Sequence, residues 1–139
     1  MAYSAVPDAK LVCKPVIVLT VWRLKLAKTF LEVEDFLKVD IRTGTITHSE
    51  INKETRQPAL KLWIDFGPII GEKKTSAKLA ELYSPENLKG KQIMAIVNFK
   101  PKQIATFMSE VLILGFSDEE NQVVLAIPDK KVPNGMKLF

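Results

Sequence analysis

Cysteine and histidine are nearly missing from this chain of 139 residues. Cys13 is the single cysteine, so an internal disulfide is excluded and the sequence fits a reducing compartment. His48 is the single histidine, which leaves no second imidazole for a histidine-based metal site and no other choice for a serine–histidine–aspartate relay. The chain also lacks a glycine-rich phosphate loop and paired carboxylates at an apolar pocket. We therefore predict no metal, no cofactor and no catalysis.

A long apolar run is missing as well. The segment Pro15–Trp22 is apolar and β-branched, but Arg23 and Lys25 cut it far short of the roughly 20 apolar residues of a membrane-spanning helix. Positive charges after the run, and no small-residue cleavage pattern, argue against a secretory signal. We predict a cytoplasmic protein without stable membrane insertion. Residues 1–33 are expected to form a peripheral extension outside the native core, with a membrane-surface role as the alternative.

The net charge of +4 is unevenly distributed. Residues 1–33 carry five basic and two acidic side chains, whereas residues 34–139 carry fifteen basic and fourteen acidic ones. The predicted domain, residues 34–139, is thus almost neutral, and its bulk charge is weak support for nucleic-acid binding.

Alternating apolar residues predict short strands rather than long helices. After a helical turn at 33–38, we expect strands at 39–47, 59–66, 93–99, 111–114 and 123–127, and a short extended segment at 73–77. In the first strand Ile41 and Ile46 have opposite parity, which predicts a bulge near Thr43–Gly44. Ser76 is expected to cap a small helix through Leu82. Trp63 points outward from its strand, either as a binding surface or partly covered by neighbours.

This order of elements predicts the fold class. An all-β chain with five short strands, one small helix between the third and fourth, and a glycine bend in the first is typical of a five-stranded OB-fold Greek-key barrel. A β-sandwich also fits the strands, but the position of the helix favours the barrel.

The stretch Val97–Gly115 is the predicted binding region. It consists of an apolar strand, a basic turn around Pro101 and a second apolar run. Its polar side chains can grip phosphates, carbonyls or amides, and a polar loop between rigid strands is a common place for a binding site. These side chains are Asn98, Lys100, Lys102 and Ser109.

Several segments together resemble CsaA-type proteins, which are export-related chaperones built on the tRNA-binding domain. The resemblance is continuous from Phe36 to Lys137 and does not cover residues 1–33. Asn98-Phe-Lys-Pro101 and Ser109 also resemble a motif of the same module in some methionyl-tRNA synthetases, but Val111-Leu112 replaces their Gly-Met, which favours the chaperone branch. The segments that carry the resemblance are 40–46, 59–67, 97–99, 109–115 and 132–135.

The resemblance implies a homodimer without catalytic chemistry that binds tRNA and unfolded or precursor polypeptide in protein export. A tRNA-binding module that acts in trans with a synthetase is the alternative. Carried over by position, the implied tRNA-binding residues are Asn98, Lys102 and Ser109 of the motif, with Lys100 beside them, and Lys73, Lys74, Ser76 and Lys78 in the groove. The implied peptide-binding residues are Ile104, Phe107, Met108 and Val111.

Two positions depart from the family pattern. Thr106 and Met108 replace a glycine and a lysine of typical members, which weakens the tRNA interpretation, while Met108 and Phe107 make the rim more adaptable to apolar peptides. Simpler roles also stay open. Asn98 can bond a turn backbone, Ser109 can satisfy an amide, and the lysines can be a solvated rim. The four apolar residues can be dimer or core packing.

Overall fold

The computed structural model of this protein describes residues 30–139. The expectations for Cys13 and for the apolar run Pro15–Trp22 lie outside the described residues. The chain divides into two compact units, Met1–Lys38 and Val39–Phe139. The described part of the first unit contains the expected helical turn, α4 (Val33–Leu37), next to which the Lys38 ammonium lies 3.1 Å from the Asp35 carboxylate.

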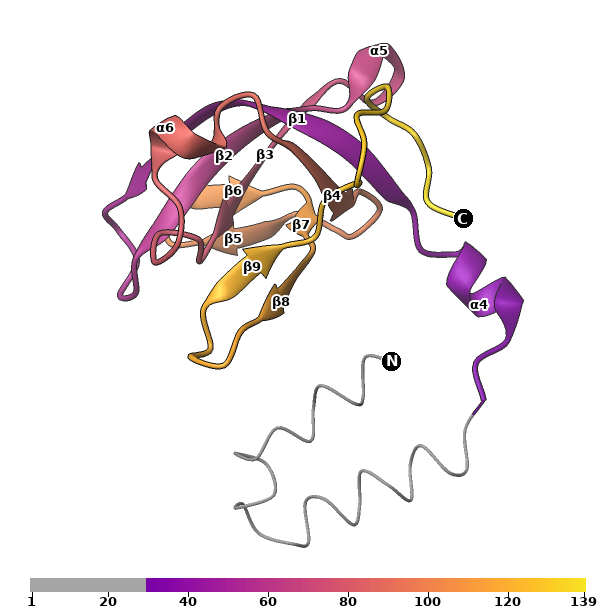
Figure 1. Ribbon diagram of the computed structural model, residues 1–139, viewed down its shortest axis with the longest axis horizontal. Helices are drawn as coiled ribbons and strands as arrows, with labels where there is room; N and C mark the ends of the chain where they lie inside the picture. Colours follow the sequence, from indigo (N-terminus) through magenta and orange to yellow (C-terminus); the bar gives the residue numbers. More distant parts are fainter. Residues whose placement is uncertain (1–29) are drawn as a thin grey trace, which may run out of the picture. The chain divides into compact units, whose positions relative to one another are not determined.

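The second unit is a curled antiparallel sheet (Figure 1). Its five strands are β1 (Ile41–Asn52), β2 (Ala59–Asp65), β3 (Glu72–Ala77), β4 (Gln92–Ile96) and β7 (Leu112–Ile113), in the order β3-β2-β1-β4-β7. Two hairpins accompany it, β5 (Lys102–Ile104) with β6 (Phe107–Ser109) and β8 (Gly115–Ser117) with β9 (Val123–Leu125). The helices α5 (Gly67–Ile70) and α6 (Pro85–Leu88) are single turns. This confirms the predicted OB-like fold.

Alternation along β2 builds the core as the sequence predicts. Leu60, Leu62 and Ile64 are completely buried, while Lys61 and Trp63 between them point to the other face. The core continues with Ile46 of β1, Ile93 and Ala95 of β4, Leu79, Leu88 and Phe66. Burial of this many apolar side chains gives the small domain most of its stability.

The β1 bulge exists, but at a different residue from the one predicted. The register between β1 and β4 is continuous from Ile41 to Thr45, whereas the pairing with β2 shifts between Ile46 and His48. The extra residue is therefore Thr47, not Thr43 or Gly44. Gly44 is required for another reason, because a Cβ there would lie 2.6 Å from Cγ2 of Ile64. Ile41 keeps the opposite parity and is buried on the outer face.

The C-terminal segment covers that outer face. The amide of Gly135 donates to the carbonyl of Thr43 at 2.7 Å, and the amide of Leu138 donates to the carbonyl of Ile41 at 2.9 Å. The segment pairs with the edge of β1 that β2 leaves free in its first half, and it brings Met136 and Leu138 into a pocket with Ile41 and Met94. Ile41 and Ile46 therefore have opposite parity because each is buried on a different face of the sheet, and not because of a bulge between them.

The small helix begins eight residues later than predicted. Ser76 belongs to β3, where it pairs with Lys61, and the predicted helix from Ser76 to Leu82 does not form. Ser84 is the actual N-cap: its Oγ accepts from the amide of Asn87 at 3.3 Å, and Pro85 occupies the first helical position. The continuing ladder with β2 outweighs the capping preference of Ser76 because it satisfies backbone groups of the whole segment.

Between β4 and β7 the structure also differs from the prediction. β4 ends at Ile96, so Phe99 is not in a strand, and the loop expected after it contains the hairpin β5–β6. Ala105, at the hairpin turn, has a φ of 56°, which lies in the left-handed region. The predicted strands 111–114 and 123–127 are shorter than expected, and β9 pairs with β8 instead of joining the main sheet.

Candidate binding groove

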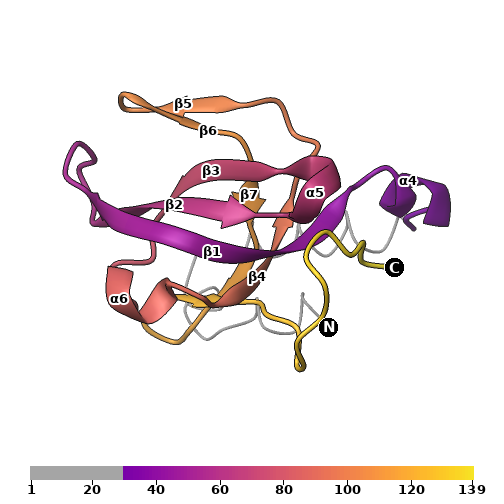
Figure 2. The same cartoon turned by 90° about the horizontal axis from the view of Figure 1, so that it is seen from above.

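The hairpin β5–β6 lies alongside β3 and packs on the outer face of the sheet (Figure 2). The ring of Phe107 meets Trp63 edge to face with centroids 5.6 Å apart, and His48 stacks against Trp63 at 4.9 Å. Phe107 is only 8% exposed. Trp63 is thus partly covered by neighbouring side chains. Of the two alternatives that the sequence left open, a binding surface or partial cover, the structure has the second.

Two ammonium groups lie over the same aromatic ring. Nζ of Lys61 is 5.3 Å and Nζ of Lys74 is 5.1 Å from the centroid of Phe107. Such contacts are worth about 0.5–1 kcal/mol each at exposed sites. Phe107 therefore anchors the hairpin, and the structure gives it a packing role beside the peptide-binding role expected from the family.

The chain after β6 closes the free edge of β3. The Ser76 amide donates to Oγ of Ser109 at 2.9 Å, and the Lys74 amide donates to Oε1 of Glu110 at 3.1 Å. In return, the Glu110 amide donates to the carbonyl of Lys74 at 2.8 Å. The buried hydroxyl of Thr75 donates to the carbonyl of Val111 at 2.7 Å. Three side-chain bonds and one backbone bond thus take the place of a continuous strand-to-strand ladder here. Ser109 satisfies a backbone amide, which is the simpler of the two roles expected for it.

A groove of about 390 Å³ lies next to this closure. It is enclosed by β3, by the chain leading into the hairpin, and by the chain from Ser109 into β7. Its inner surface is mostly apolar, and Lys100 and Lys102 supply its cations. The lining residues are Thr75, Ser76, Phe99, Lys100, Lys102, Ile104, Ser109, Glu110, Val111 and Leu112.

A second pocket of about 340 Å³ continues this groove. Ser76 and Ile104 line both, so the two pockets meet at these residues. The second pocket adds the cations Arg56 and Lys78, which are exposed. The two pockets together are called the β3 groove below.

Seven of the twelve residues expected from the sequence line the β3 groove, Lys78 in the second pocket and the other six in the first. Ser76, Lys100, Lys102 and Ser109 come from the expected tRNA-binding set, and Ile104 and Val111 from the expected peptide-binding set. Val111 is 5% exposed and forms part of the core floor, whereas Leu112 beside it is 50% exposed. The groove therefore contains members of both predicted sets.

The other expected residues lie around the groove. Lys73 pairs with Ile64 and Lys74 with Trp63, so their side chains point to opposite faces of β3 and neither lines the groove. Met108 is 37% exposed on the hairpin. Asn98 is exposed, and its Oδ1 accepts from the amide of Asp40 at 3.0 Å, which ties the start of the β1 segment to the end of β4.

Among the lining residues that sequence reasoning missed, three supply apolar surface or positive charge: Phe99, Leu112 and Arg56. Phe99 was assigned to a strand interior, yet 53% of it is exposed at the groove, because the strand ends before it. Leu112 and Arg56 received no role. The one feature of the sequence that could have indicated them is position, since Phe99 precedes and Leu112 follows the basic turn around Pro101.

Neither a cluster of metal-ligating side chains nor a membrane-spanning helix is found in the described part of the chain. Within residues 30–139, no three His, Cys, Asp or Glu side chains come together as a group that could hold a metal ion. None of the helices in the same range is long and apolar enough to cross a membrane.

Comparison with known proteins adds three findings. The family described as "Putative tRNA binding domain" matches residues 41–137. The crystal structure of the chaperone CsaA from Bacillus anthracis is 50% identical with a TM-score of 0.75, over 80% of this chain and 100% of that one. The CsaA chaperone from Picrophilus torridus is 45% identical with a TM-score of 0.74, over 79% and 100%.

Longer proteins also match. Methionine–tRNA ligase 1 of Bacillus anthracis is 35% identical over 107 residues, which are 76% of this chain and 16% of that protein. This chain therefore spans about a sixth of the length of the curated relatives it matches.

Proposed function

The chain belongs to the tRNA-binding domain family, in its CsaA-type branch, and on that premise we propose that it is a non-catalytic binding protein for tRNA and for unfolded or precursor polypeptide. The family assignment covers residues 41–137, which form the β-sheet unit. The binding of polypeptide, a role in protein export and a cytoplasmic location are part of the proposal.

The observation that carries the proposal is the composition of the β3 groove. Lys100 and Lys102 are exposed and lie at an apolar surface formed by Phe99, Ile104 and Leu112. Ammonium groups attract phosphates, and apolar and aromatic side chains accept unpaired bases or apolar peptide side chains. A groove with both features serves either ligand without any bond-breaking chemistry.

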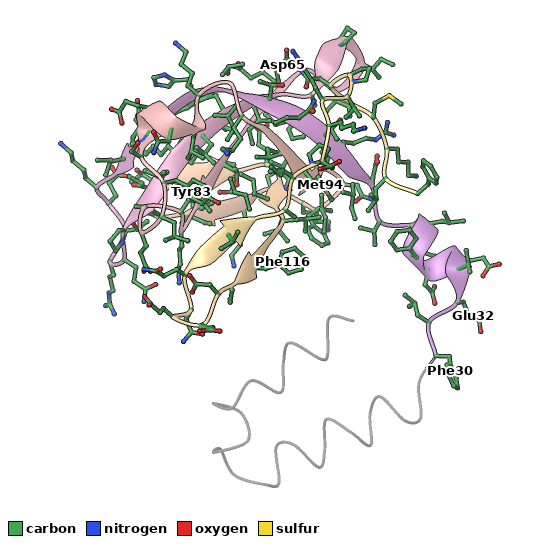
Figure 3. The ribbon with its side chains drawn as sticks, viewed as in Figure 1. Phe30, Glu32, Asp65, Tyr83, Met94 and Phe116 are labelled. Carbon is green, nitrogen blue, oxygen red and sulfur yellow. The ribbon has the colours of Figure 1, made fainter. Side chains whose placement is uncertain are left out.

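A second feature supports the proposed homodimer. Phe116 of β8, labelled in Figure 3, pairs with Val124 of β9, and the two side chains are 66% and 39% exposed. Exposed apolar side chains in a group are typical of association surfaces. Sedimentation of the intact chain should give twice the monomer mass, and Phe116→Ser with Val124→Ser should reduce it to the monomer value. An unchanged mass in the double variant would place the interface elsewhere.

The tRNA proposal is tested by a titration at several salt concentrations. Lys100→Ala combined with Lys102→Ala should weaken binding and reduce the slope of log K against log salt by roughly 0.7 per lost phosphate contact. The control is Lys130→Ala with Lys131→Ala, which removes the same charge from exposed positions outside the groove. Equal effects of the two double variants would show that the groove lysines have no particular role.

The alternative function is a tRNA-binding module that acts in trans with a synthetase. The match to methionine–tRNA ligases favours it, since those proteins contain a region similar to this chain. In that case, adding the chain to a methionine–tRNA ligase that lacks this region should increase the aminoacylation rate at low tRNA concentration. The chaperone proposal instead expects suppression of aggregation of an unfolded protein, with no change in aminoacylation.

A further inference from the structure

The two pockets of the β3 groove are neighbours along β3 and are together called the slot. They meet at Ser76 and Ile104, one on β3 and the other at the end of β5. The hairpin that forms one wall is held at its tip, where the hydroxyl of Thr106 donates to Oε2 of Glu54 in the loop after β1. Next to the tip Phe107 packs on Trp63, and at the base of the hairpin Oγ of Ser109 accepts from the Ser76 amide at 2.9 Å. A wall fixed at both ends gives the slot a defined width.

The chemistry of the slot changes along its length. Lys100 and Lys102 lie at one end and Arg56 and Lys78 at the other. All four are exposed, and none forms a salt bridge with a carboxylate among residues 30–139. Glu110 is the acidic side chain in the lining, and its Oε1 accepts from the amide of Lys74. The slot therefore has an apolar centre between two positive ends.

We propose that the polypeptide recognised by this protein is an extended segment with apolar side chains between acidic ones, and that it competes with tRNA for the β3 groove. The proposal rests on the proposed function and adds the ligand's charge pattern and the relation between the two ligands. Carboxylates pair with the cations at the ends, and apolar side chains cover Ile104 and its neighbours at the centre. A tRNA strand needs the same ammonium groups and the same apolar surface, so one ligand excludes the other.

The two ligands respond differently to salt. Binding of tRNA releases counterions from several phosphates, so its affinity falls steeply as salt rises. The peptide is held in part by burial of apolar surface, which moderate salt does not weaken. Higher salt therefore shifts the groove from tRNA towards polypeptide.

Competition is measured with the full chain by fluorescence anisotropy. The probe is a labelled peptide, Asp-Glu-Ser-Leu-Ser-Ile-Ser-Glu-Asp, and the competitor is unfractionated tRNA. At a tRNA concentration ten times its own Kd, the apparent Kd of the peptide should rise about 11-fold and keep rising in proportion to tRNA. A plateau or an unchanged Kd would overturn the shared groove. A control peptide with lysine at each acidic position should bind at least tenfold more weakly, and equal binding would overturn the charge pattern.

Variants assign the competition to the groove. Ile104→Ser should weaken peptide binding several-fold, whereas Lys130→Ala with Lys131→Ala should leave it unchanged, with folding of each variant checked by circular dichroism. Equal peptide affinity of Ile104→Ser and the unchanged chain, with the fold intact, would contradict the inference. If tRNA binds alone but the peptide does not, the inference fails and the tRNA part of the proposed function stands. If tRNA itself does not bind, both fail.

Discussion

Replacing Gly44 by alanine places a methyl group between β1 and two fully buried side chains. The added Cβ would lie 2.6 Å from Cγ2 of Ile64 and 2.8 Å from Cδ1 and Cε1 of Phe66. Both neighbours are at most 1% exposed, so neither can move into solvent. The methyl group must therefore push β1 away from the core or force both side chains out of their rotamers.

Two effects of opposite sign determine the change in stability. Overpacking of a filled core costs about 1–3 kcal/mol. Loss of glycine's freedom in the unfolded chain stabilises the protein by about 0.4–1 kcal/mol. We expect a net loss of about 1–2 kcal/mol, and for a domain of this size each kcal/mol lowers Tm by about 4–8 °C. Thermal and urea unfolding of the two proteins measure the difference.

A control at a different glycine separates packing from backbone effects. Gly90 has a φ of 86°, and a Cβ there meets nothing within 4 Å, so Gly90→Ala is costly only through its backbone. In a Phe66→Leu background, the cost of Gly44→Ala should decrease by at least 0.5 kcal/mol, whereas that of Gly90→Ala should not change. A Gly44→Ala protein as stable as the unchanged chain, or equal coupling of both glycines to Phe66, would refute the packing argument.

Three further predictions concern the hairpin and its surroundings. Phe107→Ala should cost about 3–5 kcal/mol in unfolding free energy and speed hydrogen exchange in β5 and β6, because it removes the contact with Trp63; unchanged exchange would contradict this. Ser109→Ala should cost about 1–3 kcal/mol because the Ser76 amide loses its acceptor, whereas Ser117→Ala on exposed β8 should cost almost nothing in the same urea titration. Asn98→Asp keeps an oxygen acceptor for the Asp40 amide, so Tm should stay within about 2 °C, while the new charge beside Lys100 should weaken tRNA binding; unchanged affinity would remove Asn98 from the tRNA surface.

The sequence by itself determined most of the barrel. Alternation from Leu60 to Ile64 depends only on the period of a strand, so it predicts which side chains of β2 enter the core. The basic turn around Pro101 and the apolar residues after it lie in the region that forms the β3 groove. Each of these features is local in the chain.

Only the tertiary structure decided where the non-local contacts form. The bulge lies at Thr47, and Ile41 is buried because the C-terminal segment pairs with β1, a partner more than ninety residues away. Ser76 stays in a strand because β2 offers it a ladder and Ser109 offers its amide an acceptor. Phe107 turns towards Trp63, which leaves Ile104, Phe99 and Leu112 to line the groove. Periodicity shows which residues share a face, but the groove depends on which distant segment covers that face, and this follows from packing of the whole chain.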